Sequence, residues 1–218
     1  MRPFAAVAQG YRAVLDPVER QVIASIVAEV VELLGAELDT APPGPEETGL
    51  LARALAPERA SVPDDPAVRR LLPDASRDDP EVSEEFRRLT EGDLRDTKVR
   101  RLVAFWRLLQ AGGGTRGDRL ELARDDASDL AATLTDVRLV LADRLGLSDD
   151  EQVEALYTEL EGDEPDRSTD PEAVEDAQRR RFLGSVYTLL TYLQESLLTA
   201  MLRDLPRDRP RDLPGVGG

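Results

Sequence analysis

The stretch DPEAVEDAQRRRFLGSVYTLLTYLQESLLTAMLRDL, residues 170–205, decides the fold that we predict for this chain. Asp170, Pro171 and Glu172 are typical of a helix start, because Asp can cap the first turn and Pro fits inside it. A helix from there to Leu205 would be about 50 Å long at 1.5 Å per residue. Its second half is apolar on more than one face, so we expect it in the middle of a helical bundle or at a dimer interface.

The most apolar part of this stretch, residues 182–202, is also the best candidate for a membrane span. A spanning helix needs about 20 predominantly apolar residues. Glu195 is the only charge in the segment, but six further polar residues interrupt it: Ser185, Thr188, Thr191, Gln194, Ser196 and Thr199. We therefore interpret it as a buried core helix. The N-terminus MRPFAAVAQG lacks a basic region followed by an apolar core, so no signal peptide is expected.

The rest of the chain also reads mainly as helix. Capping signals and three- and four-residue apolar spacing predict helices over about 16–35, 48–55, 65–72, 79–89, 90–110, 125–145 and 148–161. A new helix is expected at Thr90, because Thr90-Glu91-Gly92-Asp93 matches a capping box. FAAVAQGYRAVLD, residues 4–16, predicts a hairpin with Gln9-Gly10 as its turn, and RLELA, residues 119–123, is a candidate third strand.

The predicted fold is therefore mainly α. It is a single-domain helical bundle over residues 1–204, built around the long C-terminal helix, with a small N-terminal antiparallel β-hairpin that a third strand would extend. Residues 205–218 are rich in Pro and charge, which predicts a disordered tail. The spacing assigns these side chains to the core: Leu94, Val99, Leu102, Val103, Trp106, Leu109, Leu130, Leu134, Val137, Leu141 and Leu145.

Composition excludes several classes of enzyme. The 218 residues include no Cys and no His, so Ser-His-Asp and Cys-His catalysis, Cys/His zinc sites and disulfides cannot occur. No phosphate-binding Gly-rich motif is present. Acidic runs such as Asp78-Asp79 and Glu81 could hold a metal ion, but Asp79 and Glu81 are better explained as helix-start residues. We expect a protein that is not an enzyme and has no cofactor or metal.

One helix–turn–helix outline raises the question of DNA binding. It is ADRLGLSDDEQVEALYTEL, residues 142–160, in which the turn joins two predicted helices. The second helix carries only acidic charges: Asp149, Asp150, Glu151, Glu154, Glu159 and Glu161. Phosphates would repel it, and the net charge of the chain is −16. An ordinary helical corner is the simplest interpretation, and the alternative is an acidic surface that docks a basic protein through Asp149, Asp150, Glu151 and Glu154.

Two basic stretches could in principle bind an anion or nucleic acid, but each is better explained as the solvated face of a helix. LRDTKVRRLVAFWR, residues 94–107, contains the only lysine, Lys98. Helical spacing places Asp96, Lys98 and Arg101 on a solvated face. Arg179-Arg180-Arg181 is interpreted in the same way, with Glu172, Glu175 and Asp176 one turn earlier as intrahelical partners.

Five segments in order resemble an actinobacterial family of unknown function that includes the AosR-type oxidative-stress regulators. They are MRPF, LDPVERQVIASIVAEVVELL, LLPDASRDDPEVSEEFRRLTEGDLRDTKVRRL, LTDVRLVLADRLGL and FLGSVYTLLTYLQESLL, and they cover nearly the whole chain. The resemblance implies a cytoplasmic, non-enzymatic regulator that acts with the transcription machinery. The family has been linked to redox sensing through cysteine. That switch cannot carry over, because Met1 and Met201 hold the only sulfur atoms here.

The expected function is regulation through protein–protein contacts, with a sigma factor or RNA polymerase as the partner that the resemblance suggests. The alternative is a homodimeric structural or adaptor module. Direct binding to nucleic acid or to a membrane is not expected, and the predicted location is the cytoplasm.

Overall fold

The computed structural model describes residues 1–38, 65–73, 80–111, 118–162 and 170–205, with side chains except over 80–89. Along the chain it contains β1 (Arg2–Val7), β2 (Gly10–Val14), α1 (Pro17–Leu33), α3 (Pro66–Leu71), α4 (Pro80–Gln110), β3 (Arg119–Ala123), α5 (Ala127–Leu145), α6 (Asp150–Glu161) and α7 (Pro171–Asp204). The predicted fold is confirmed: mainly helical, with a long C-terminal helix and a small sheet whose third strand is RLELA. The helix predicted at 48–55, the acidic pair Asp78-Asp79 and nearly all of the predicted tail lie outside the described residues.

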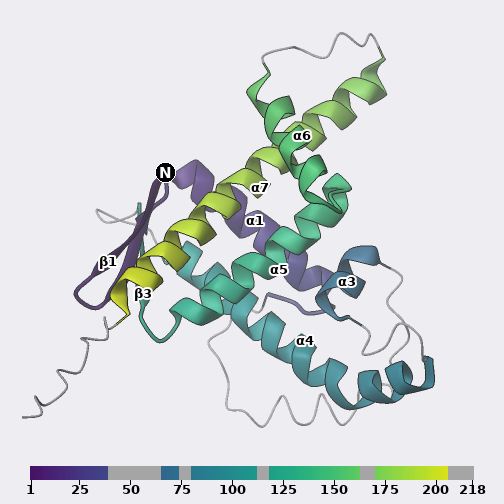
Figure 1. The fold of residues 1–218 in the computed structure, drawn as a ribbon, viewed down its shortest axis with the longest axis horizontal. Helices are drawn as coiled ribbons and strands as arrows, with labels where there is room; N and C mark the ends of the chain where they lie inside the picture. The colour runs from purple at the N-terminus through teal and green to yellow at the C-terminus, as the bar shows by residue number, and fades with distance from the viewer. Residues whose placement is uncertain (39–64, 74–79, 112–117, 163–169, 206–218) are drawn as a thin grey trace, which may run out of the picture.

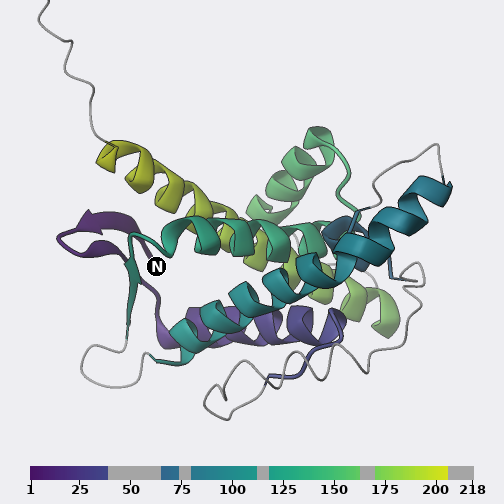
Figure 2. The same ribbon diagram turned by 90° about the horizontal axis from the view of Figure 1, so that it is seen from below.

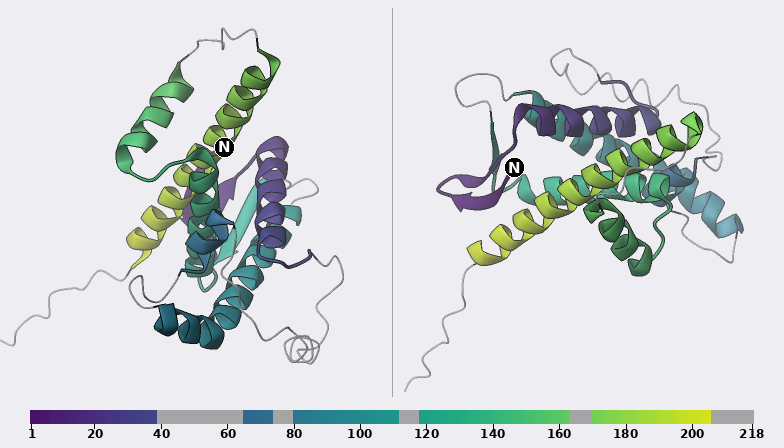
Figure 3. Two further views of the ribbon diagram at one scale, coloured as in Figure 1. Left: turned by 90° about the vertical axis from the view of Figure 1, so that its right-hand side faces the viewer. Right: turned by 90° about the horizontal axis from the view of Figure 1, so that it is seen from above.

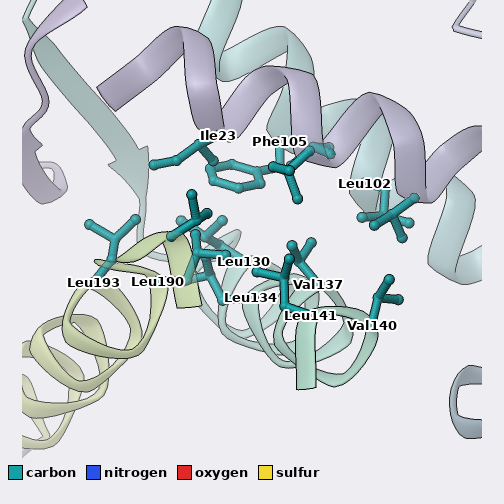
Figure 4. Close-up of a cluster of buried hydrophobic side chains, with 14 of the residues drawn as sticks. Ile23, Leu102, Phe105, Leu130, Leu134, Val137, Val140, Leu141, Leu190 and Leu193 are labelled. Atoms are coloured by element: carbon teal, nitrogen blue, oxygen red, sulfur yellow. The ribbon is translucent and has the colours of Figure 1, made fainter. Parts of the chain in front are cut away.

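Two pairs of helices make the body of the molecule. α1 packs on α4, and α5 packs on α7 (Figures 1 and 2). Figure 4 shows the core between them, where Phe105 of α4 lies among Ile23 of α1 and Leu130 and Leu134 of α5. The sheet lies at one end of the bundle, against the C-terminal part of α7, and α6 with the start of α7 lies at the other (Figure 3).

The sheet is antiparallel, in the order β1-β2-β3, and a two-residue turn at residues 8–9 joins β1 to β2. The turn predicted at Gln9-Gly10 is therefore displaced by one residue. Gly10 belongs to β2, pairs with Val7 and Ala123, and has φ +151°. A Cβ at this position would lie 2.0 Å from the Leu122 carbonyl oxygen, so the strand requires glycine because another backbone approaches it too closely for any side chain.

α1 begins with the predicted capping box. The Asp16 carboxylate accepts hydrogen bonds from the Val18 and Glu19 amides, and the Glu19 carboxylate accepts one from the Asp16 amide at 2.8 Å. The other Glu19 oxygen lies 2.9 Å from the Met1 amino group. One helix start thus also fixes the first strand.

α4 is one continuous helix, so the expected new helix at Thr90 is wrong. No proline follows Pro80 within it, and an isolated Gly92 costs only about 1 kcal/mol, which leaves nothing to break the helix. Leu102 and Leu109 are fully buried as predicted, while Leu94 is exposed. The periodicity missed Phe105, which is only 3% exposed.

α7 is confirmed as a single helix from Pro171 to Asp204. The described helices include none that is apolar over enough of its length to cross a membrane. The C-terminal end of α7 contacts the sheet: Asp204 lies 2.6 Å from the Arg124 guanidinium and accepts a hydrogen bond from Tyr11 Oη. The hydrogen bond from Arg124 lowers the pKa of Asp204, and burial raises the pKa of Tyr11.

Candidate functional site

The acidic corner forms where α5 ends and α6 begins. Gly146 adopts φ +71° and ends α5, and the Leu147 amide donates to the Ala142 carbonyl. Asp149 caps α6 by accepting from the Gln152 amide at 2.9 Å. The Gln152 side chain in turn accepts from the Ser148 amide at 2.7 Å. The sequence Ser148-Asp149-Asp150-Glu151 matches a capping box with Ser148 as the cap. In the structure Asp149 caps the helix instead, and the Gln152 side chain binds the amide of the residue before the cap, so the reciprocal pair is not formed.

The four predicted interface residues lie together on the first turns of α6, and we call them the acidic α6 surface: Asp149, Asp150, Glu151 and Glu154. All four are exposed. Asp149 is occupied by its capping role. The carboxylates of Asp150, Glu151 and Glu154 make no hydrogen bond or ion pair with any residue that the structure describes. Three carboxylates within two helical turns are thus free to meet a positively charged partner.

α6 is held by a few apolar side chains and by two arginines of α7. Leu156 is its only buried residue, and it packs on Gly184 so closely that a Cβ there would lie 2.9 Å from Leu156 Cδ1. Arg180 bridges Glu159 at 3.0 Å and donates to the Leu145 carbonyl. Arg181 donates to the Gly162 carbonyl at 2.7 Å.

These contacts correct the interpretation of Arg179-Arg180-Arg181 as a solvated face with intrahelical partners. Arg180 and Arg181 bind α6 instead of the acidic residues one turn earlier. Sequence spacing within α7 could not show this, because the partners lie about twenty residues away in the chain. The consequence is that the arginines anchor the back of α6 and leave the acidic α6 surface outward.

The basic stretch of α4 is also used inside the fold, so its interpretation as a solvated face is wrong for Lys98. Lys98 Nζ lies 2.5 Å from the Asp136 carboxylate, and both side chains are largely buried. Arg95 donates to the Leu34 carbonyl at 2.9 Å. Arg101 bridges Asp129 of α5 at 2.8 Å. Lys98 and Arg101 thus bind α4 to α5, and Arg95 joins α4 to the end of α1.

A polar network between α5 and α7 was not predicted. Arg138 donates to Gln194 Oε1 at 2.7 Å and to Tyr187 Oη at 3.3 Å, and its guanidinium lies 5.1 Å from the centre of the Tyr187 ring. Gln194 donates in turn to Thr135 Oγ1. The polar residues that interrupt the apolar segment of α7 therefore include one that pairs with α5. Figure 1 shows these two helices side by side.

The chemistry available at the acidic α6 surface is electrostatic. Within the described residues, no three acidic side chains converge as the ligands of a metal ion would. The Gln152 amide at the start of α6 is already used by the Asp149 cap. The surface therefore offers negative charge on a rigid helix, which is suited to attracting and orienting a basic macromolecule.

Residues 1–201 match the family described as Domain of unknown function (DUF2017). Neither a curated protein nor a solved structure matches the chain. The family description specifies no activity.

Proposed function

The chain belongs to the Domain of unknown function (DUF2017) family, and we propose that it is a non-enzymatic regulatory protein that binds another protein through the acidic α6 surface. One observation carries the proposal. Asp136, Asp129 and Asp65 of the bundle body are each paired with a lysine or arginine of another element, whereas Asp150, Glu151 and Glu154 are exposed and pair with no described residue. Their charge contributes to no ion pair that holds the fold.

The expected partner is a basic protein surface. Opposite charge speeds association and favours the correct orientation of two proteins. The same charge repels nucleic acid, and α6 offers no basic residue that could contact a phosphate. Within the transcription machinery suggested by the family resemblance, a sigma factor or RNA polymerase is the proposed partner, and the proposed location is the cytoplasm. A cysteine switch takes no part, because the chain contains no cysteine.

Titration of the purified chain with the sigma factors and the RNA polymerase core of its own host tests this role. We expect binding that weakens as salt rises, because exposed charges are screened beyond about 10 Å at 0.1 M salt. A chain with Asp150, Glu151 and Glu154 changed to Lys should lose this binding. If neither partner binds the native chain at low salt, the transcription role is wrong.

The alternative is a homodimeric adaptor, and one observation favours it. α7 leaves three large apolar side chains exposed near its C-terminal end, Tyr192, Leu198 and Leu202, the last 69% exposed. A self-association surface would cover such residues. Light scattering across a concentration series tests this: a mass that doubles, and that returns to the monomer value in Leu198→Asp but not in Val18→Asp, would support the dimer. Val18 is an exposed apolar residue on α1 and serves as the control.

A further inference from the structure

A cavity of about 320 Å³ lies between α4, β3 and α5, away from the acidic α6 surface. Its apolar lining includes Phe105 of α4, Leu122 of β3 and Leu130 of α5, each less than a tenth exposed. Figure 4 shows Phe105 and Leu130 in the buried cluster between the helices. The cavity floor is therefore the outer side of the core, and it is held rigid by core packing. Ligand pockets of this volume are typically apolar with a few charged groups that orient the ligand.

The mouth of the cavity carries both signs of charge, and part of that charge is already neutralised. Arg101 bridges Asp129 at 2.8 Å, and Glu121 bridges Arg12 of the neighbouring strand at 2.9 Å. These two pairs leave no free charge for a ligand.

Two charged groups at the mouth are left over. Arg100 lines the cavity, is exposed, and among the described residues donates only to Thr97 Oγ1, at 3.3 Å. Asp126, directly before α5, lines the cavity on the side of that helix. It precedes the first turn of α5, but its side chain makes no capping hydrogen bond and contacts no described cation. One free guanidinium and one free carboxylate therefore face the same apolar cavity.

The ion pairs between the helices place these two groups on opposite sides of the cavity. α4 and α5 run antiparallel, since Lys98 pairs with Asp136 while Arg101 pairs with Asp129. Asp126 lies one turn before Asp129, and so it faces the turn of α4 that follows Arg101. Arg100 lies one turn of α4 earlier, next to Arg101. The backbone positions of Arg100 and Asp126 are thus offset along the helices by about one turn, roughly 5 Å.

We propose that this cavity binds a small zwitterion whose anionic and cationic groups are joined by a short apolar segment. The anionic group meets Arg100, the cationic group meets Asp126, and the apolar segment lies on Phe105, Leu122 and Leu130. A molecule with only one charge leaves either Arg100 or Asp126 unmatched. The site is distinct from the protein-docking role and does not depend on it.

The test uses ω-aminohexanoate as the probe and isothermal titration calorimetry on the full chain. We expect saturable binding that is at least about tenfold weaker in Arg100→Ala and in Asp126→Asn. Arg107→Ala and Asp125→Asn are the matched controls, because each removes an exposed charge of the same sign nearby without lining the cavity. Both controls should bind as the native chain does.

Two further measurements separate binding in the cavity from binding elsewhere. Ala104→Trp fills the mouth from α4, and should abolish binding while circular dichroism and the melting temperature show a folded chain. Hexanoate, which lacks the amino group, should bind the native chain more weakly than ω-aminohexanoate does. The Asp126→Asn chain should bind the two molecules equally. The proposal is overturned if the probe does not saturate the native chain, or if the cavity variants and their controls bind it alike.

Discussion

The α4–α5 interface and the α6 corner use charge in opposite ways. Between α4 and α5, Asp136 is only 5% exposed and lies 2.5 Å from Lys98, the only lysine in the chain. On α6, Asp150, Glu151 and Glu154 are exposed and pair with no described residue. Charge therefore holds the helices together in the body, and at the corner it remains available to another molecule.

The difference also shows in how each helix is held. α5 packs on α1, α3, α4 and α7, whereas α6 packs on α7 and buries only Leu156. A helix with one buried side chain can detach without unfolding the bundle, since local openings cost less where few apolar contacts are made. Variants in the two regions should consequently differ both in magnitude and in how far their effects spread.

The largest effect is expected from Asp136→Ala. Removing one partner of a buried pair leaves the other charge uncompensated, which costs about 3–5 kcal/mol. Because Lys98 keeps slight access to water, we expect the free energy of unfolding, measured by urea titration, to fall by about 3 kcal/mol. Asp129→Ala is the control: it removes the exposed partner of Arg101 in the same interface and should cost less than about 1 kcal/mol. Equal losses in the two variants would show that burial does not distinguish these pairs.

Leu156→Ala should have the next largest effect, and it should stay local. Truncating a buried Leu removes about 2–5 kcal/mol of stabilisation. Here we expect roughly 2 kcal/mol, seen as faster amide hydrogen exchange in α6 while α5 keeps its protection. Thr158→Ala, on the exposed side of α6, is the control and should leave exchange unchanged. A loss of protection that spreads equally through α5 would mean that α6 is an integral part of the bundle.

Acid should weaken the body through Asp65. Its carboxylate, on the residue before α3, lies 2.6 Å from Arg144 of α5, and that hydrogen bond lowers its pKa. A carboxyl whose pKa is lower in the folded chain stabilises it above the unfolded pKa of about 3.9, and this stabilisation is lost as pH falls through the folded value.

The pair is partly exposed, so its contribution is at most about 1 kcal/mol. Asp65→Asn keeps an acceptor for the Ala67 amide but removes the charge. In urea titrations from neutral pH down to about pH 2, the difference in stability between native and variant should shrink as pH falls below about 4. A difference that is constant across this range would contradict the assignment.

The smallest effect on stability is expected from neutralising the free acids of the corner, with Asp150→Asn, Glu151→Gln and Glu154→Gln together. The favourable interaction of Asp150 and Glu151 with the helix N-terminus is lost, while the repulsion among the three charges is relieved. These terms oppose each other, so the free energy of unfolding should change by less than about 1 kcal/mol. A larger loss in a urea titration would show that these acids hold the fold.

Local signals predicted the elements well, and long-range partners account for the errors. Asp16 and Asp170 begin the helices where the sequence indicates, because capping depends on neighbours two or three residues away. Gly10 lies in β2 and not in the turn, where it pairs with Ala123 and lies against the Leu122 backbone, more than a hundred residues later. Local spacing cannot reveal such a contact.

The same distinction applies to the candidate site. The exposed acids of α6 were predicted, because a helix with so few apolar residues cannot bury more than one side. The anchoring by Arg180 and the pairing of Lys98 were not predicted, since each partner comes from another helix. The sequence thus identified the exposed carboxylates of α6 but not the charges that the fold pairs.

The most direct test of the docking role is a crosslinked pull-down from the protein's own cells, read by mass spectrometry. Three chains are compared: the native chain, one with Asp150, Glu151 and Glu154 changed to Lys, and a control with Glu29, Glu32 and Glu37 changed to Lys. The control alters three exposed acids of α1 and its C-terminal end, so both variants have the same net charge. We predict that a sigma factor or RNA polymerase subunit is captured by the native and control chains and lost with the α6 variant. Capture that is equal in all three, or lost equally in both variants, would contradict the proposal that the acidic α6 surface is the docking site.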